Sequence, residues 1–234
     1  GDAIASECDM FVDAKDRDYV YINRVMQDLV PFGKKKFRYR LYVSEDSSPN
    51  AFALPGGVIF VTRGLLETIH SQSELVAVLA HEMGHIELSH CLDHVKFGLA
   101  AKKLGIKTIG DLADETISLM MRDSFSKTQE DDADMYAFDL LSASKYDPSA
   151  EGRVYNAFIK WCAENGGESR KKGDLVRDYF MSHPPMEIRA EKYREKARKW
   201  WKDNNNERRY VGRMNMKNRF AEKVDGEWRS GAND

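Results

Sequence analysis

Long apolar runs are absent from this sequence, and cysteine is scarce. No stretch of 18 consecutive apolar residues occurs among the 234 residues, which argues against a membrane-spanning helix. The three cysteines, Cys8, Cys91 and Cys162, are odd in number and far apart. They therefore do not form a disulfide framework, and they say little about the cellular compartment. No signal peptide is visible, although the start at Gly1 leaves room for a leader trimmed beforehand.

What is present is enough for a folded domain. Hydrophobic residues make up 42% of the chain and charged residues 32%, so the chain can bury a core. The length fits one ordinary domain, or one domain with a helical appendage. The net charge of −2 hides an uneven distribution, because acids dominate residues 111–139 and basic residues dominate 186–219. Internal repeats and low-complexity tracts are absent.

One five-residue pattern stands out from this background. His81-Glu82-Met83-Gly84-His85 follows the apolar run 75–79, and Ser71 with Glu74 has the spacing of a capping box, so the pattern is predicted to lie on a helix. Histidines four apart lie one turn apart on the same helical face, where both can bind one zinc ion. The glutamate between them can act on a zinc-bound water. Glycine in a helix interior costs about 1 kcal/mol relative to alanine, which suggests that something packs closely against Gly84.

Periodicity predicts a mainly helical α+β fold with a small antiparallel or mixed sheet beside the histidine-bearing helix. Strands are expected at 37–43, 50–54 and 58–62, the last two joined by the turn signal Pro55-Gly56-Gly57. Helices are expected at 9–30, 65–70, 73–89, 112–143 with a break near 124–126, 149–164 and 186–202. On the last of these, Tyr193, Ala197 and Trp200 are expected to form the packing side. Beyond Asp203 the sequence is polar, and we make no structural prediction there.

Two histidines leave a catalytic zinc ion one protein ligand short. In sites of the His-His-Glu type the third ligand is a carboxylate on a later helix. Glu130 is the best candidate, because the small Ala133 lets the two helices approach each other. Asp134 lies one turn further along the same face and can accept a hydrogen bond from the outer nitrogen of a ligand histidine. Asp131 and Asp132 are expected to face solvent.

His90 and His94 form a second histidine pair four residues apart. The pair can in principle bind a metal, but it lacks a neighbouring glutamate and a clear third ligand. A structural or surface role is favoured for both residues.

At this point the chain resembles a known family of zinc endopeptidases, the one that includes the CAAX prenyl proteases, HtpX and the BepA-like periplasmic metalloproteases. The resemblance is carried by five motifs in this order: Asn50-Ala51-Phe52-Ala53-Leu54-Pro55-Gly56-Gly57, His81-Glu82-Met83-Gly84-His85 with His90, Phe125-Ser126-Lys127-Thr128-Gln129-Glu130-Asp131-Asp132-Ala133-Asp134, Tyr146-Asp147-Pro148, and Ser182-His183-Pro184-Pro185 with Arg189. Their joint order is far more specific than any one of them. Lys127 stands where the family often has arginine, and Lys145 where glycine often precedes Tyr-Asp-Pro; neither departure touches the metal site.

The resemblance implies a gluzincin fold, a small sheet on a helical bundle, with one zinc ion (Zn2+) on His81, His85 and Glu130. It also makes His183 the candidate donor to the developing oxyanion, with Arg189 near it. The alternative for His183 is a residue that only starts a helix.

The resemblance bears on domain limits and location as well. The membrane helices of HtpX and the prenyl proteases are absent, so the soluble branch is the closer match. We expect residues 1–203 to form a zinc metallopeptidase domain and 204–234 a polar tail of uncertain structure. The expected location is the bacterial periplasm or cell envelope.

The expected reaction is hydrolysis of peptide bonds in proteins. Glu82 is expected to take a proton from zinc-bound water as the water attacks the peptide carbonyl, and to pass this proton to the leaving amine. A sheet edge could bind the substrate as an added strand, a mode that suits unfolded or misassembled clients. The candidate edge consists of Asn50, Ala51, Phe52, Ala53 and Leu54. An ordinary inner hairpin strand is the alternative for this segment.

Two other classes of function are left open. One is a zinc-bound chaperone-like or autoinhibited binding module with little proteolysis, although the intact Glu82 argues against it. The other is docking of the basic 186–219 segment on anionic lipid or nucleic acid. The interspersed Glu187, Glu191 and Glu195 favour a solvated, ion-paired helix instead. We therefore expect a protein or peptide as partner and no nucleic acid, and we leave peripheral or lipid-anchored membrane association open.

Overall fold

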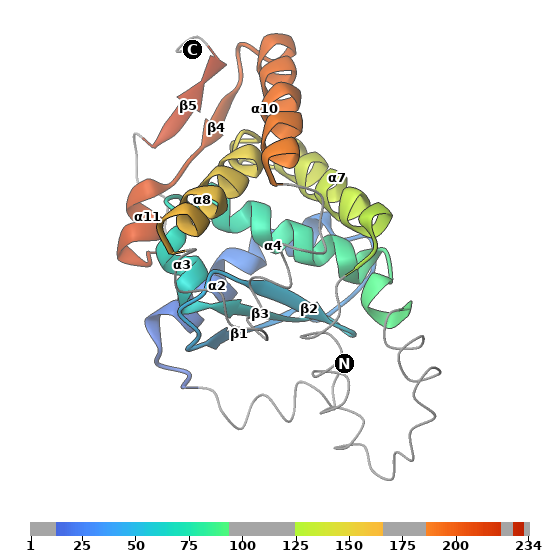
Figure 1. The fold of residues 1–234 in the computed structure, drawn as a ribbon, viewed down its shortest axis with the longest axis vertical. Helices are drawn as coiled ribbons and strands as arrows, with labels where there is room; N and C mark the ends of the chain where they lie inside the picture. The colour runs from blue at the N-terminus through green and yellow to red at the C-terminus, as the bar shows by residue number, and fades with distance from the viewer. Residues whose placement is uncertain (1–12, 94–124, 166–185, 221–226, 232–234) are drawn as a thin grey trace.

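The computed structural model describes residues 13–93, 125–165, 186–220 and 227–231, and Figure 1 shows their arrangement. Its helices and small mixed sheet confirm the expected α+β class. In chain order the elements are α2 (Arg17–Gln27), the 3-10 helix η1 (Val30–Phe32), β1 (Arg40–Ser44), β2 (Ala51–Leu54), β3 (Val58–Thr62), α3 (Arg63–Thr68), α4 (Gln72–Glu87), α7 (Lys127–Ala143), α8 (Ala150–Asn165), α10 (Met186–Asp203), β4 (Arg208–Tyr210), α11 (Arg213–Asn218) and β5 (Trp228–Ser230).

Helix α4 is the centre of the molecule. All 16 of its residues are buried, with the three-stranded sheet on one side and α7 and α8 on the other (Figure 1). At its start the Ser71 hydroxyl accepts a hydrogen bond from the Glu74 N–H. The Glu74 carboxylate accepts from the His70 N–H at 2.6 Å rather than from Ser71, so only half of the predicted capping box forms. The histidine-bearing helix is thus a core helix with tertiary contacts on every face.

The sheet has the order β1-β3-β2, which leaves β2 at an edge. Strand β3 pairs in parallel with β1 and antiparallel with β2. The Thr62 N–H donates to the Asn50 carbonyl. Because antiparallel pairs alternate, the N–H and C=O groups of Ala51 and Ala53 face away from β3. Among the strands that the structure describes, these two residues therefore present the main-chain groups of an edge, as the substrate-strand prediction requires.

Helices α4 and α7 cross at Gly84, where even a methyl group would be tightly packed. A Cβ atom on Gly84 would meet the Ala133 Cα at 3.1 Å and the Tyr136 Cβ at 3.2 Å. The small residues at this crossing bring the two helices together next to the histidines, as expected from the sequence.

The segment after α10 packs on the same core. Strands β4 and β5 pair antiparallel, and Tyr210 and Met216 are buried in the core cluster that also contains α4. The N–H groups of Gln72 and Ser73, in the first turn of α4, donate at 3.0 Å to the carbonyls of Gly212 and Val211. The first turn of α4 is therefore completed by residues about 140 positions later in the chain.

Several predicted boundaries were wrong. Helix α2 begins at Arg17 rather than at residue 9, because the Asp16 carboxylate caps the Tyr19 N–H at 2.8 Å; residues 9–12 lie outside the described ranges. By contrast, helix α7 begins at Lys127, directly after the expected break near 124–126, where Ser126 and Gln129 form a full capping box, and it ends at Ala143 as predicted; residues 112–124 are not described. On α10, Tyr193 and Ala197 are buried and the half-buried Trp200 packs against their cluster, as predicted, while the buried Trp201 was not predicted.

Within the described ranges, no helix combines the length and the apolar character that crossing a membrane requires.

Candidate metal site

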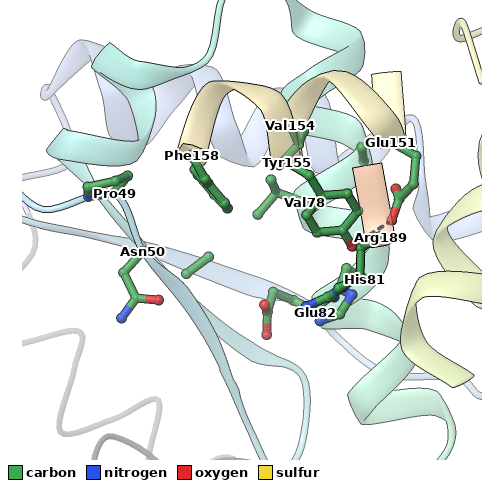
Figure 2. Close-up of a pocket in the computed structure, with 12 residues that line it drawn as sticks. Pro49, Asn50, Val78, His81, Glu82, Glu151, Val154, Tyr155, Phe158 and Arg189 are labelled. Atoms are coloured by element: carbon green, nitrogen blue, oxygen red, sulfur yellow. Dashed lines mark hydrogen bonds between the residues drawn. The ribbon is translucent and has the colours of Figure 1, made fainter. Parts of the chain in front are cut away.

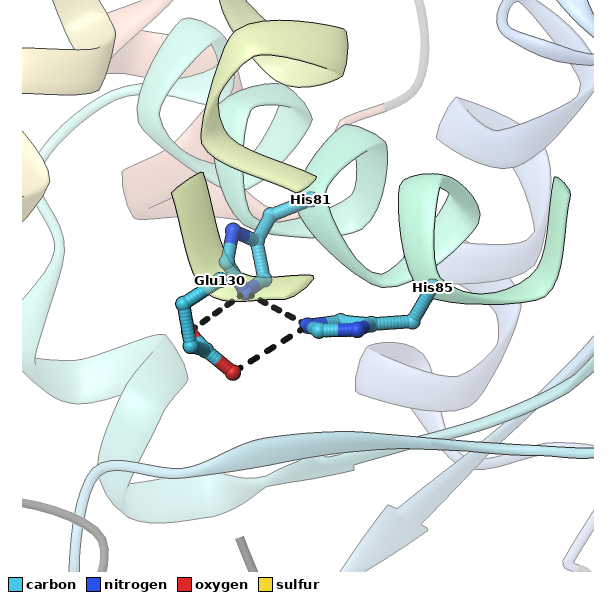
Figure 3. A group of neighbouring side chains, drawn as sticks. All are labelled: His81, His85 and Glu130. Carbon is cyan, nitrogen blue, oxygen red and sulfur yellow. Dashed lines mark hydrogen bonds and ion pairs between the residues drawn. The ribbon is translucent and has the colours of Figure 1, made fainter. Parts of the chain in front are cut away.

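Three predicted ligands meet between α4 and α7. The Nε2 atoms of His81 and His85 lie 3.1 Å apart, and both face the Glu130 carboxylate (Figure 3). Glu130 Oε2 is 3.5 Å from His81 Nε2, and Glu130 Oε1 is 3.4 Å from His85 Nε2. All three side chains are buried. Helical spacing places the histidines on one face of α4, and the crossing at Gly84 brings Glu130 to them.

These distances fit a zinc ion. Zinc–nitrogen and zinc–oxygen bonds of about 2.0–2.1 Å in a tetrahedral site place the ligand atoms about 3.3–3.4 Å apart. The three measured separations bracket this value. The charge of the group points the same way. Burial works against a charged imidazole, but Asp134 and Glu130 outweigh it and hold the pKa of His81 well above its ordinary value. Burial outweighs Glu130 at His85 and lowers its pKa to about 4, so this imidazole is in the neutral form that binds a metal.

The other nitrogen of His81 faces a second set of buried groups. His81 Nδ1 lies 2.9 Å from Asp134 Oδ1. The Arg189 guanidinium donates to both Asp134 oxygens, with Nε 2.9 Å from Oδ2, and its Nη2 lies 3.4 Å from Glu130 Oε2. The Tyr155 hydroxyl donates to Asp134 Oδ1 at 2.6 Å. Burial raises the pKa of Asp134, but His81 and Arg189 outweigh it and lower that pKa to about 2. Asp134 is thus an anion that can fix the tautomer of His81.

His85 has a comparable outer partner that the sequence analysis missed. His85 Nδ1 lies 3.1 Å from His90 Nδ1, and His90 is buried. The Phe125 ring stacks on the His85 ring at 3.8 Å between centroids. His90 thus lies against a predicted metal ligand rather than on the surface, while its supposed partner His94 lies outside the described ranges. Its position five residues after His85, beyond the end of α4, was the available signal.

Glu82 lies beside the metal group and next to the edge strand. Its carboxylate is buried, and the nearby Ala53 N–H of β2 favours its charged form. Burial raises the pKa of Glu82 to about 7, against the lowering effects of His81 and of Ala53. A carboxyl group with a pKa near neutrality can both accept and release a proton at physiological pH.

A pocket opens beside Glu82 and His81, between β2, α4 and α8 (Figure 2). Its walls are mostly apolar, and Pro49 and Asn50 lie at the end opposite Glu151 and Arg189. The apolar lining consists of Ala51, Ala77, Val78, Val154, Tyr155 and Phe158. The predicted substrate-strand residues Asn50 and Ala51 therefore border the same pocket as Glu82.

Glu151 is a further buried acid that the sequence analysis missed. It lies on α8, and its Oε1 is 3.1 Å from the Tyr155 hydroxyl. Burial, with a contribution from Asp134, raises the pKa of Glu151 to about 8. The available signal was its spacing: Glu151, Val154, Tyr155 and Phe158 fall on one helical stripe, so an acid shares the apolar face.

The remaining predicted site residues are partly or fully exposed, lie on β2 or fall outside the described ranges. Asp131 is half-exposed and pairs with Lys192 at 2.9 Å, and Asp132 is exposed, so neither joins the metal group. Phe52 is half-buried and Leu54 is buried on β2. His183 lies outside the described ranges.

A buried His-His-Glu group, a glutamate beside it and a sheet edge along the same pocket define the class of metallopeptidase domains. The chain belongs to peptidase family M48, whose model matches residues 17–197. The resemblance drawn from the motifs is thereby confirmed.

Curated relatives carry metalloprotease names. The chain is 29% identical over 185 residues to the mitochondrial metalloendopeptidase OMA1 of Schizosaccharomyces pombe, covering 75% of this chain and 52% of the relative. It is 30% identical over 172 residues to metalloprotease YcaL of Escherichia coli, covering 68% and 61%. A third relative, metalloprotease LoiP of Escherichia coli, is 27% identical over 168 residues, covering 68% and 62%. The chain thus spans between half and two thirds of the length of these relatives.

Proposed function

We propose that this chain is a zinc-dependent endopeptidase that hydrolyses peptide bonds in proteins. His81, His85 and Glu130 hold one zinc ion, and Glu82 is the general base. The observation that carries the proposal is the spacing of the three ligand atoms, between 3.1 and 3.5 Å, with Glu82 on α4, the helix that carries the two histidines. Membership of family M48 and the names of its curated relatives support it.

Each residue has a defined task in this reaction. Zinc, when bound, lowers the pKa of a coordinated water and polarises the peptide carbonyl. Glu82 accepts the proton of the attacking water on its carboxylate and delivers it to the leaving amine. Asp134, held by Arg189 and Tyr155, orients His81 through Nδ1, and His90 faces Nδ1 of His85.

The substrate is proposed to extend along β2. The outward N–H and C=O groups of Ala51 pair with an extended chain, while the Ala53 N–H lies near Glu82 and favours its charged form. Ala53→Pro would therefore disturb the base as well as the edge, and Ala51→Pro is the better probe. We expect Ala51→Pro to raise KM with metal content and folding intact, as measured by steady-state kinetics. Unchanged kinetics would move the substrate away from β2. Phe52→Ala should change cleavage preference only modestly.

Main-chain pairing suits unfolded or misassembled proteins, and we propose such proteins of the cell envelope as clients. A periplasmic or envelope location stays a prediction, because one relative is named mitochondrial. Peripheral or lipid-anchored membrane association also stays open.

The direct test is Glu82→Gln. The substitution keeps the shape of the side chain and removes the base, so kcat on an unfolded protein should fall about 10²- to 10⁴-fold. Zinc content, measured by mass spectrometry, should stay at one per chain. Glu164→Gln, on the exposed side of α8, is the matched control. Full activity of Glu82→Gln with zinc bound would require another base. A zinc-loaded wild type that binds unfolded protein without cleaving it would favour the binding module.

His183 is proposed as the oxyanion donor on the resemblance alone. His183→Ala should lower kcat, because one lost donor costs about 3–4 kcal/mol of transition-state stabilisation, and zinc content should not change. Loss of zinc would make His183 a ligand instead.

A further inference from the structure

Glu151 places an unpartnered polar atom at one end of the pocket beside Glu82. The residue is 2% exposed, and its Oε2 atom is buried with no hydrogen-bond partner among the described residues. Figure 2 shows Glu151 beside Tyr155 and Arg189, at the end of the pocket away from Asn50. A buried acceptor without a partner destabilises the fold by about 1–3 kcal/mol. Its presence in a pocket therefore suggests a ligand that donates a hydrogen bond to it.

Nearby donors are already committed. The Tyr155 hydroxyl has one proton and lies 2.6 Å from Asp134 Oδ1 but 3.1 Å from Glu151 Oε1, so the shorter bond takes it. The Arg189 guanidinium donates to Asp134 and faces Glu130. If Glu151 carries a proton on Oε1, it donates to the Tyr155 oxygen and Oε2 is a carbonyl oxygen. If Glu151 is ionised, Oε2 is a carboxylate oxygen. In both states Oε2 accepts a hydrogen bond.

The walls that lead to this atom are apolar. Val78 comes from α4, and Val154 and Phe158 come from α8. A substrate side chain that fits this pocket would have an apolar stem to contact the walls and a hydrogen-bond donor at its tip to reach Glu151. Lysine and arginine have this form, and their donors can pair with the Glu151 oxygen at the end of the pocket.

We propose that Glu151 is a specificity-determining residue, and that this pocket takes a lysine or arginine side chain of the polypeptide substrate. The substrate class is thus an unfolded segment with a basic residue next to the scissile bond. This inference rests on the proposed endopeptidase function, because the side chain reaches the pocket from a main chain on β2.

The experiment compares peptides that differ in one group. Norleucine has the stem of lysine without the ammonium, so matched peptides carry lysine or norleucine at each position around the cleaved bond in turn. The readout is kcat/KM by mass spectrometry. A second readout is peptide affinity for the Glu82→Gln protein, measured by fluorescence anisotropy. At one position the wild type should prefer lysine at least about tenfold, the size of one hydrogen bond to a charged group.

The variants decide the role of Glu151. Glu151→Leu should abolish or invert the preference in both readouts, and Glu151→Gln should weaken it. Glu164→Gln, exposed on the same helix, should leave it unchanged. If Glu151→Leu does not fold, Glu151→Gln carries the comparison. Equal preference in the wild type and the Glu151 variants overturns the inference while the endopeptidase function stands. A zinc-loaded wild type that cleaves none of the peptides overturns both.

Discussion

The His81 imidazole separates two buried groups that look alike as metal sites. On its Nε2 side are His85 and Glu130, and on its Nδ1 side are Asp134 and Glu151. In each group the donor atoms lie within 4.8 Å of one another, and all the residues are buried. The two groups share Arg189 unequally, because its guanidinium donates to both oxygens of Asp134 but lies 3.4 Å from a single oxygen of Glu130. A protein cation thus compensates the Nδ1 side, and the Nε2 side is the one whose donor atoms fit a metal ion.

The difference teaches that carboxylates and a histidine do not by themselves define a metal centre. The charge balance around them decides, and that balance depends on a residue from a distant helix. Four substitutions test this contrast.

Removing the guanidinium should have the largest effect. Arg189→Met leaves Asp134 buried without its cation, which should lower the free energy of unfolding by about 3–5 kcal/mol. Lys192→Met on the same helix removes a half-exposed ion pair and should cost at most about 1 kcal/mol. Urea denaturation of both variants gives the comparison. Similar small losses would show that Arg189 does not balance the Nδ1 side.

Removing the carboxylate on the other side should act on metal rather than on stability. Glu130→Gln should weaken zinc affinity by more than the roughly 10- to 100-fold typical of an outer partner. Asp131→Asn, one position along, should leave affinity unchanged. Titration against a chelator of known affinity measures both. Equal affinities would remove Glu130 from the ligands.

Widening the crossing of α4 and α7 should have an intermediate effect. The methyl group of Gly84→Ala would press on Ala133, so overpacking should cost about 1–3 kcal/mol, partly offset by about 1 kcal/mol of helix propensity. Thermal denaturation and zinc titration should both show a loss. A more stable protein with unchanged zinc affinity would mean that the crossing has room for a methyl group.

The smallest effect concerns a second buried Arg–Asp pair, away from the histidines. Burial raises the pKa of Asp147, but Arg153 at 2.7 Å outweighs it, so that pKa lies below its ordinary value. A lowered folded-state pKa adds stability above the unfolded value of about 3.9, and this stability is lost as the pH falls through the folded value. Below about pH 4, wild type should therefore lose stability more steeply than Asp147→Asn. Asp139→Asn, which is exposed, should keep the wild-type slope; urea midpoints at several pH values test this.

The three proposed metal ligands and Asp134 could be predicted from sequence, because their positions depend on local helical spacing. His81 and His85 share a helical face by spacing alone, and Glu130 and Asp134 do so on α7. Helical spacing also kept Asp131 and Asp132 away from the group. Only the meeting of the two helices is non-local, and Gly84 with Ala133 indicated it.

Arg189, Glu151 and the strands β4 and β5 could not be predicted from local spacing. Arg189 was found only through the resemblance, because a buried guanidinium is stable only with partners, and these come from the distant helices α7 and α8. Glu151 was missed, since a composition-based interpretation treats a helical acid as solvated. The strands β4 and β5 were missed because their pairing joins residues about 20 apart and depends on Tyr210 in the core.

The hydrogen bonds that the carbonyls of Val211 and Gly212 accept from the first turn of α4 have a consequence for biosynthesis. A ribosome adds residues in order at about 5–20 per second, so the histidine-bearing helix leaves the ribosome several seconds or more before its N-terminal N–H groups can find these acceptors. Contacts between such distant residues also form late, because a long loop must close first. We therefore expect a nascent chain to carry all three predicted zinc ligands before its central helix is fixed in place. The newly made protein would pass through a stage at which it can bind metal but cannot yet cut.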